Sequence, residues 1–197
     1  ENNVHLQQYA RQLKEWLAQV TTTTRPQIYL DVRGSLGQLY NNNIGKILGA
    51  IFGLEYATKP YPLALVDPIF DEDPLGQRKR LSNLKQYLGF RKLKTEIWVR
   101  QTVKGLDEIE PLAQSGGVDG LQIDVLQWET LAKVIEGMQI GRAAGLPLTL
   151  ILPPHIGPQE ATFFYELAAA AQPNYLLLRG SIPQIYNLFK RQHHPAD

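Results

Sequence analysis

The chain alternates between short, almost continuously apolar runs and longer amphipathic segments. The apolar runs are rich in β-branched and aliphatic side chains, a pattern typical of strands that are buried on both faces of a parallel sheet. They predict strands at Gln27–Asp31, Leu63–Val66, Glu96–Val99, Gly120–Ile123, Leu146–Leu152 and Tyr175–Leu178.

Between these runs, apolar residues recur at the i, i+3, i+4 spacing of amphipathic helices. One helix followed by six strand–helix units predicts a parallel α/β fold, either doubly wound or a barrel. The predicted helices are Val4–Val20, Ile44–Tyr56, Leu75–Leu88, Leu106–Gln114, Trp128–Gly145, Pro158–Ala171 and Pro183–Arg191.

Composition favours an ordinary globular domain, because 44% of the 197 residues are hydrophobic and 20% are charged. We expect a single domain over residues 1–197, with a polar tail at 192–197. Lys and Arg exceed Asp and Glu by only one, so no global charge favours nucleic acid or membrane. Cysteine is absent, which excludes thiol chemistry and fits a cytoplasmic location. The start lacks Met and signal-peptide anatomy, so we expect a piece of a longer chain.

Loops after the first two strands are the places to look for ligand chemistry, since parallel α/β proteins bind ligands at strand carboxyl ends. Gly34–Gly37 (GSLG) lacks the remaining residues of a nucleotide fingerprint, and we expect a tight turn there. The loop Asp67–Pro74 (DPIFDEDP) carries four acidic residues that either bind a cation or are simply solvated, and we favour solvation: Asp67, Asp71, Glu72 and Asp73.

Five segments give the chain a family resemblance: IYLDVRGSLG (28–37), LALVDPI (63–69), EIWVRQTVKGLDEIEPLAQSG (96–116), GLQIDV (120–125) and AAAAQPNYLLLRG (168–180). In this order and spacing they resemble the C-terminal barrel of methylaspartate ammonia-lyase, in the enolase superfamily. The resemblance implies a TIM-type β/α barrel that this chain enters at the third strand, without the capping domain and first two strands. A closed barrel needs eight strands. The remaining strands or a partner protein would then cover the open barrel edges.

The resemblance also implies a magnesium-dependent reaction that removes a proton beside a carboxylate and expels ammonia. The family holds the metal on three carboxylates and uses a lysine as base. Asp31 matches the first metal ligand, but Val66 stands at the second and Arg100 at the third. Asp124 replaces the lysine, and Gln122 matches a glutamine that contacts the substrate. The sequence therefore predicts that magnesium binding is lost, that no cofactor is bound, and that the chain is non-catalytic.

The replacements at Arg100 and Asp124 exchange the signs of the family's acid and lysine. We expect Arg100 to bridge to Asp31 or Asp124 and so to place a fixed positive charge at the former metal site. The alternative is that these are unrelated surface residues at strand ends. A remaining pocket is predicted to bind a small carboxylate or anion through Arg33, Arg100, Gln122 and Arg179.

Three functions follow from these residues. The leading prediction is a pseudoenzyme domain that serves binding or assembly in a larger protein. One alternative is a metal-independent carbon–nitrogen lyase or isomerase, in which Arg100 binds a small carboxylate substrate. The other is an interaction module built on the basic residues of segment 78–94, where Tyr87 and Phe90 interleave. For that segment we favour a solvated helical face. RNA or an acidic partner would suit that segment, although nucleic acid is not expected for the chain as a whole.

Overall fold

The computed structural model describes residues 2–19, 25–101, 103, 105–154, 156 and 158–177. Strands and helices alternate throughout this part of the chain, as predicted. The strands are β1 (Ile28–Asp31), β2 (Leu63–Val66), β3 (Glu96–Val99), β4 (Gly120–Asp124), β5 (Leu148–Ile151) and β6 (Tyr175–Leu177). The helices are α1 (Asn2–Gln19), α2 (Ser35–Leu39), α3 (Ile44–Thr58), α4 (Pro74–Phe90), the 3-10 helix η1 (Leu106–Glu108), α5 (Ile109–Gln114), α6 (Leu131–Ala143) and α7 (Pro158–Ala171).

Two compact units make up the chain. Unit 1 comprises Glu1–Val103 and Pro111–Asp119, and unit 2 comprises Lys104–Glu110 and Gly120–Asp197. The expectation of one domain over residues 1–197 stays a prediction.

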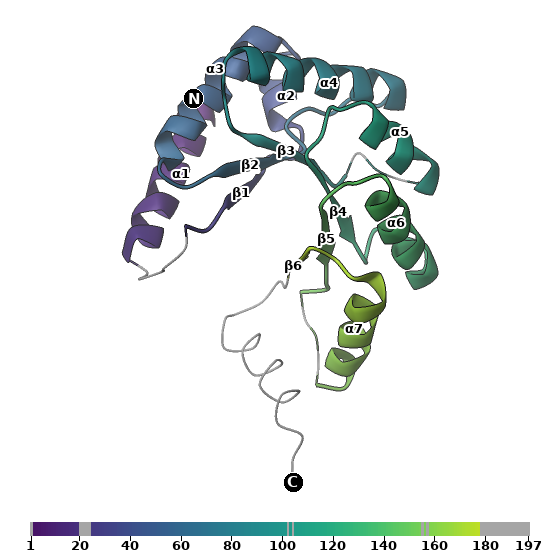
Figure 1. Ribbon diagram of the computed structural model, residues 1–197. Helices are drawn as coiled ribbons and strands as arrows, with labels where there is room; N and C mark the ends of the chain where they lie inside the picture. The colour runs from purple at the N-terminus through teal and green to yellow at the C-terminus, as the bar shows by residue number, and fades with distance from the viewer. Residues whose placement is uncertain are drawn as a thin grey trace. The chain divides into compact units, whose positions relative to one another are not determined.

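Unit 1 is built on the parallel strands β1, β2 and β3, whose register aligns Asp31 with Val66 and Val66 with Trp98. Successive residues of a strand point to opposite faces. The face that carries Leu30, Leu65 and similar aliphatic residues is almost completely buried. Helices α1, α3 and α4 lie on one side of these strands (Figure 1).

The other face of the unit 1 strands is filled by a small aromatic and aliphatic cluster. Ala64, Val66 and Trp98 are buried together, and Tyr29 packs against them. The rings of Tyr29 and Trp98 meet edge to face, with centroids 5.3 Å apart and an interplanar angle of 74°. We call these four residues the apolar floor. Asp31 and Arg100 lie beyond it, at the carboxyl ends of β1 and β3.

Unit 2 repeats the arrangement with β4, β5 and β6, again parallel and in sequence order. Leu121, Ile123, Leu148 and Leu150 occupy one buried face. Small residues let α6 approach this face, since a Cβ on Gly141 would lie 2.7 Å from the Leu148 side chain. The other face carries polar side chains from two neighbouring strands.

Local signals explain where the helices begin. The side chain of Asn43 caps α3 by accepting the Lys46 N–H, and Thr130 caps α6 by accepting the Lys133 N–H. Asp73 caps α4, where its two carboxylate oxygens accept the N–H groups of Leu75 and Gly76. Pro74 at the first helical position of α4 loses no hydrogen bond there.

The predicted parallel α/β fold is confirmed, with corrections at several boundaries. Gly34 has φ +76° and makes the predicted turn, but α2 follows it and was missed, because five residues are too few for an apolar period. The helix predicted from Trp128 begins only at Leu131, since Thr130 is its cap. Leu106–Gln114 splits into η1 and α5 because Pro111 has no N–H for a bond to the carbonyl four residues earlier.

Some predictions fall outside the described residues: the helix at Pro183–Arg191, the tail at 192–197 and the ligand-binding role of Arg179. Within the part of the chain that the structure describes, no helix is long and apolar enough to cross a membrane.

Candidate functional site

Strand register brings two of the predicted metal-ligand positions together. Asp31 ends β1 directly beside Val66, which ends β2, and alternation puts both side chains on the face of the apolar floor. Val66 is 1% exposed and packs against Trp98. An isopropyl group therefore occupies the place between the Asp31 carboxylate and β3.

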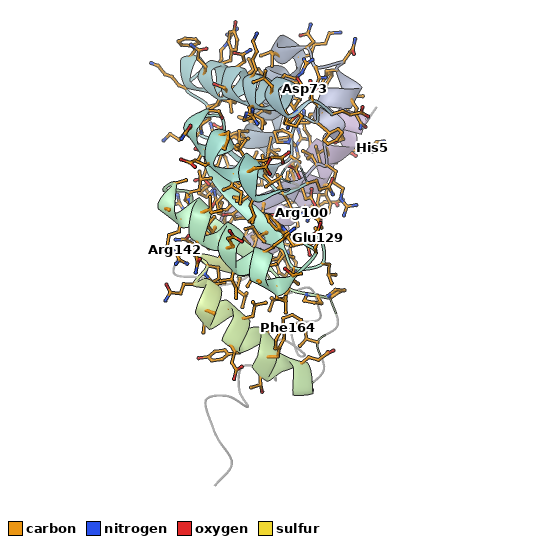
Figure 2. The ribbon with its side chains drawn as sticks, turned by 90° about the vertical axis from the view of Figure 1, so that its right-hand side faces the viewer. His5, Asp73, Arg100, Glu129, Arg142 and Phe164 are labelled. Carbon is orange, nitrogen blue, oxygen red and sulfur yellow. The ribbon has the colours of Figure 1, made fainter. Side chains whose placement is uncertain are left out.

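Arg100, the third position, directly follows β3 and is 6% exposed (Figure 2). Its Nη2 lies 2.8 Å from Oδ2 of Asp31. The sequence-based prediction that Arg100 bridges to Asp31 is therefore confirmed, and the reading of Arg100 as a surface residue is wrong. Among the described residues, Arg100 Nε has no hydrogen-bond partner although it is buried. This leaves one guanidinium donor without an acceptor.

Arg33 lies on the solvent side of the same carboxylate. It stands in the turn after β1 with φ +48°, and its Nε is 3.6 Å from Asp31 Oδ2. Its side chain is 69% exposed, compared with 28% for that of Asp31. Such exposed pairs contribute little stability, so Arg33 is available to another anion.

Asp67 fixes the backbone of Arg100. It follows Val66 with φ +49°, and its two carboxylate oxygens accept the N–H groups of Arg100 at 3.0 Å and Gln101 at 2.9 Å. Burial raises the pKa of Asp67 above its ordinary value, although these two hydrogen bonds oppose the shift. The charge of Asp31 raises this pKa further and that of Arg100 lowers it.

The solvated reading of the acidic loop is wrong for Asp67, which is 1% exposed. The sequence placed Asp67 in the loop, because local sequence gives no information about hydrogen bonds to backbone groups that are distant along the chain. Two of the other three acids have local tasks, and Glu72 is exposed. Asp71 forms an ion pair with Arg80, which lowers the Asp71 pKa, and Asp73 caps α4. Among the described residues, no group of three or more His, Cys, Asp or Glu side chains is placed to hold a metal ion.

In unit 2, Gln122 and Asp124 share one face of β4 and are 6% and 3% exposed. Asp124 Oδ1 accepts the N–H of Leu126 at 3.1 Å. Thr149 on β5 aligns with Gln122 and is also buried. Sequence reasoning missed Thr149, although a hydroxyl inside the apolar run LTLIL was a usable signal. Unit 2 thus holds a buried polar row with glutamine, threonine and aspartate.

The residues of unit 1 do not fit a magnesium ion. Magnesium requires several oxygen ligands in near-octahedral geometry. Of the three positions, only Asp31 offers a carboxylate, Val66 offers none, and the Arg100 guanidinium already contacts the Asp31 oxygen.

Comparison with known proteins decides the family. The family model for the methylaspartate ammonia-lyase C-terminus matches residues 1–177. The chain belongs to this family. The resemblance seen in the sequence is therefore confirmed.

Methylaspartate ammonia-lyase 2 of Carboxydothermus hydrogenoformans is 24% identical over 155 residues, which cover 79% of this chain and 37% of that protein. This methylaspartate ammonia-lyase-like chain therefore spans little more than a third of the curated relative that it matches.

Solved structures agree on the fold. A magnesium complex of β-methylaspartase from Clostridium tetanomorphum has a TM-score of 0.78 at 16% identity, over 95% of this chain and 49% of that one. The Citrobacter amalonaticus enzyme containing (2S,3S)-3-methylaspartic acid has a TM-score of 0.81 at 17% identity, over 95% and 47%. A mandelate racemase/muconate lactonizing protein from Herpetosiphon aurantiacus scores 0.55 at 14% identity, over 89% and 51%. The predicted six-stranded part of a TIM-type barrel is thus confirmed.

Proposed function

We propose that this methylaspartate ammonia-lyase-like domain does not carry out magnesium-dependent ammonia elimination. In this proposal an Arg100–Asp31 ion pair replaces the metal centre, and the domain serves binding or assembly within a larger protein. The observation that carries the proposal is the 2.8 Å contact between Arg100 Nη2 and Asp31 Oδ2 at a buried position.

Electrostatics support the replacement. A dication about 4 Å from a guanidinium at an effective dielectric constant of about 20 is repelled by on the order of 8 kcal/mol. A guanidinium carries a permanent positive charge in proteins, so the repulsion is permanent. Asp31 alone supplies too few oxygen ligands to offset it. Loss of magnesium binding follows from this charge balance.

A metal-independent enzyme is less well supported. Such chemistry needs a group with a perturbed pKa that is within reach of a substrate. Asp67 has a raised pKa, but its carboxylate holds the backbone of Arg100 and Gln101 and is 1% exposed. A buried acid with this task is a structural group. A small anion at Arg33 and Arg100 remains compatible with a binding domain.

The partner that we propose is the remainder of the barrel. In the described part of the chain, β1 pairs with β2 on one side only, which leaves a parallel edge. Open edges invite aggregation unless another strand or a covering segment protects them. We propose that strands from the same protein or from a second protein complete the sheet at β1.

The test is a titration of the intact natural protein with magnesium by calorimetry, beside an assay for ammonia release from 3-methylaspartate. We expect neither heat nor turnover. The matched variant Val66→Glu/Arg100→Asp restores carboxylates beside Asp31, and magnesium should raise its thermal unfolding temperature while leaving that of the natural protein unchanged. Clear magnesium binding or turnover by the natural protein would show that the proposal is wrong.

A further inference from the structure

The ends of α3 and α4 form an exposed surface that the site does not use. We propose that this surface binds an acidic segment of a partner protein. It comprises three aromatic and four basic residues, which we call the helix-end patch: Tyr56, Lys59, Tyr87, Phe90, Arg91, Lys92 and Lys94. It lies just before the start of β3, whereas Arg100 follows the end of that strand, so patch and site occupy opposite ends of β3.

A single carboxylate holds the two helix ends together. Glu55 Oε2, on α3 next to Tyr56, accepts the N–H groups of Lys94 at 2.8 Å and Thr95 at 3.0 Å, and the Thr95 hydroxyl at 2.8 Å. The segment that leaves α4 is therefore anchored to the last turns of α3. The aromatic and basic residues at the ends of both helices therefore lie at the same end of unit 1.

The aromatic rings of the patch are unusually open to solvent. Tyr56 is 67% exposed, Tyr87 47% and Phe90 70%. Tyr87 and Phe90 meet edge to face with centroids 6.0 Å apart, and Lys59 Nζ lies 6.0 Å from the centre of the Tyr56 ring. Clustered exposed rings mark interaction surfaces, where Tyr, Phe and Arg are enriched.

Carboxylates neutralise two of the basic residues of α4, Arg80 and Lys85, but none at its end. Arg80 pairs with Asp71, and Lys85 pairs with Asp119. Figure 2 labels Asp73, the cap residue at the beginning of this helix. Beyond them, Arg91, Lys92 and Lys94 are exposed, and none of them forms an ion pair with a residue that the structure describes. Glu55, the adjacent acid, is occupied by backbone and hydroxyl donors. The patch is therefore positively charged.

Lys92 adopts a conformation that favours glycine. Its φ is +55°, its N–H donates to the Gly89 carbonyl, and the Leu93 N–H donates to the Leu88 carbonyl. These two bonds form a Schellman motif, in which glycine usually takes the left-handed position. A lysine there costs about 1 kcal/mol relative to glycine. Despite this cost, a lysine stands two residues after Phe90, directly after the C-cap of α4.

An acidic protein segment suits this surface better than nucleic acid does. Nucleic-acid binding rests on an extended stripe of free cations, and the pairs at Arg80 and Lys85 interrupt any stripe along α4. The net charge of the chain is only +1. A compact patch that combines rings with a few cations matches a peptide with alternating acidic and aromatic side chains.

The test measures fluorescence anisotropy of a labelled peptide of alternating Glu and Tyr, with single-stranded oligothymidylate as the competing probe. We expect the intact protein to bind the peptide, more weakly as salt rises. The triple variant Arg91→Glu/Lys92→Glu/Lys94→Glu should weaken binding about tenfold or more, which corresponds to at least ~1.4 kcal/mol. Phe90→Ser should weaken it by a smaller factor without changing the salt dependence.

The matched control reverses the exposed cations Arg11, Arg25 and Lys46, none of which belongs to the patch, to glutamate, an identical change in net charge. Its peptide affinity should equal that of the natural protein, and circular dichroism checks that each variant is folded. Three results would overturn the proposal: no binding by the natural protein at low salt, equal weakening in the control, or tighter binding of oligothymidylate than of the peptide.

Discussion

The ion pair between Arg100 and Asp31 makes a quantitative prediction about stability. Two unit charges about 4 Å apart interact by ~4 kcal/mol at an effective dielectric constant of about 20. The Asp31 side chain is 28% exposed, so solvent screens the pair, and we expect a coupling free energy of about 2 kcal/mol. Removal of Asp31 should be the more harmful change, because it leaves the buried guanidinium without this carboxylate. Removal of Arg100 leaves an aspartate that water can reach.

The assay is a double-mutant cycle of Asp31→Asn and Arg100→Met, followed by urea unfolding at neutral pH and moderate salt. Asp31→Asn should destabilise by about 2–3 kcal/mol and Arg100→Met by about 1 kcal/mol, with the double variant no worse than Asp31→Asn. The exposed i,i+4 pair of Lys133 and Glu129 is the control, and its cycle should show no measurable coupling. A coupling below about 0.5 kcal/mol for Arg100 and Asp31 would refute the reasoning.

Two further predictions concern residues around the site. Burial raises the pKa of Asp67, so ionisation of this carboxyl destabilises the folded protein relative to the unfolded chain. The free energy of unfolding should therefore fall as pH rises from the ordinary pKa of an aspartate through the raised pKa of folded Asp67. Urea unfolding across that range should show this fall in the natural protein and not in Asp67→Asn; parallel pH profiles would contradict it. Gly34→Ala should destabilise by about 2 kcal/mol or more, since φ is +76° and the new Cβ would lie 2.6 Å from Phe70 Cβ. Gly145→Ala, at φ +78° with no neighbour within 4 Å, should lower the free energy of unfolding by only about 1 kcal/mol. If both variants lost the same stability, the contact with Phe70 would not explain the effect at Gly34.

The sequence alone determined the alternation of strands and helices. The strands Leu63–Val66 and Glu96–Val99 were predicted with the observed bounds, since parallel strands buried on both faces read as continuous apolar runs. The sequence also determined which charges meet at the carboxyl ends of β1 and β3, because strand period and family register together fix which residue points inward. The Arg100–Asp31 contact followed from that register.

Only the tertiary structure decided what each polar residue does there. Asp67 looked like one acid of a solvated loop, but its carboxylate accepts the backbone N–H groups of Arg100 and Gln101, which follow β3 and lie more than thirty residues away in sequence. Likewise, the sequence presents the basic segment of α4 as one charged surface. In the structure, Asp71 pairs with Arg80 and Asp119 pairs with Lys85, so two of its cations are neutralised. Such partners are invisible to periodicity, because side-chain hydrogen bonds and ion pairs depend on distances between elements that local sequence does not encode.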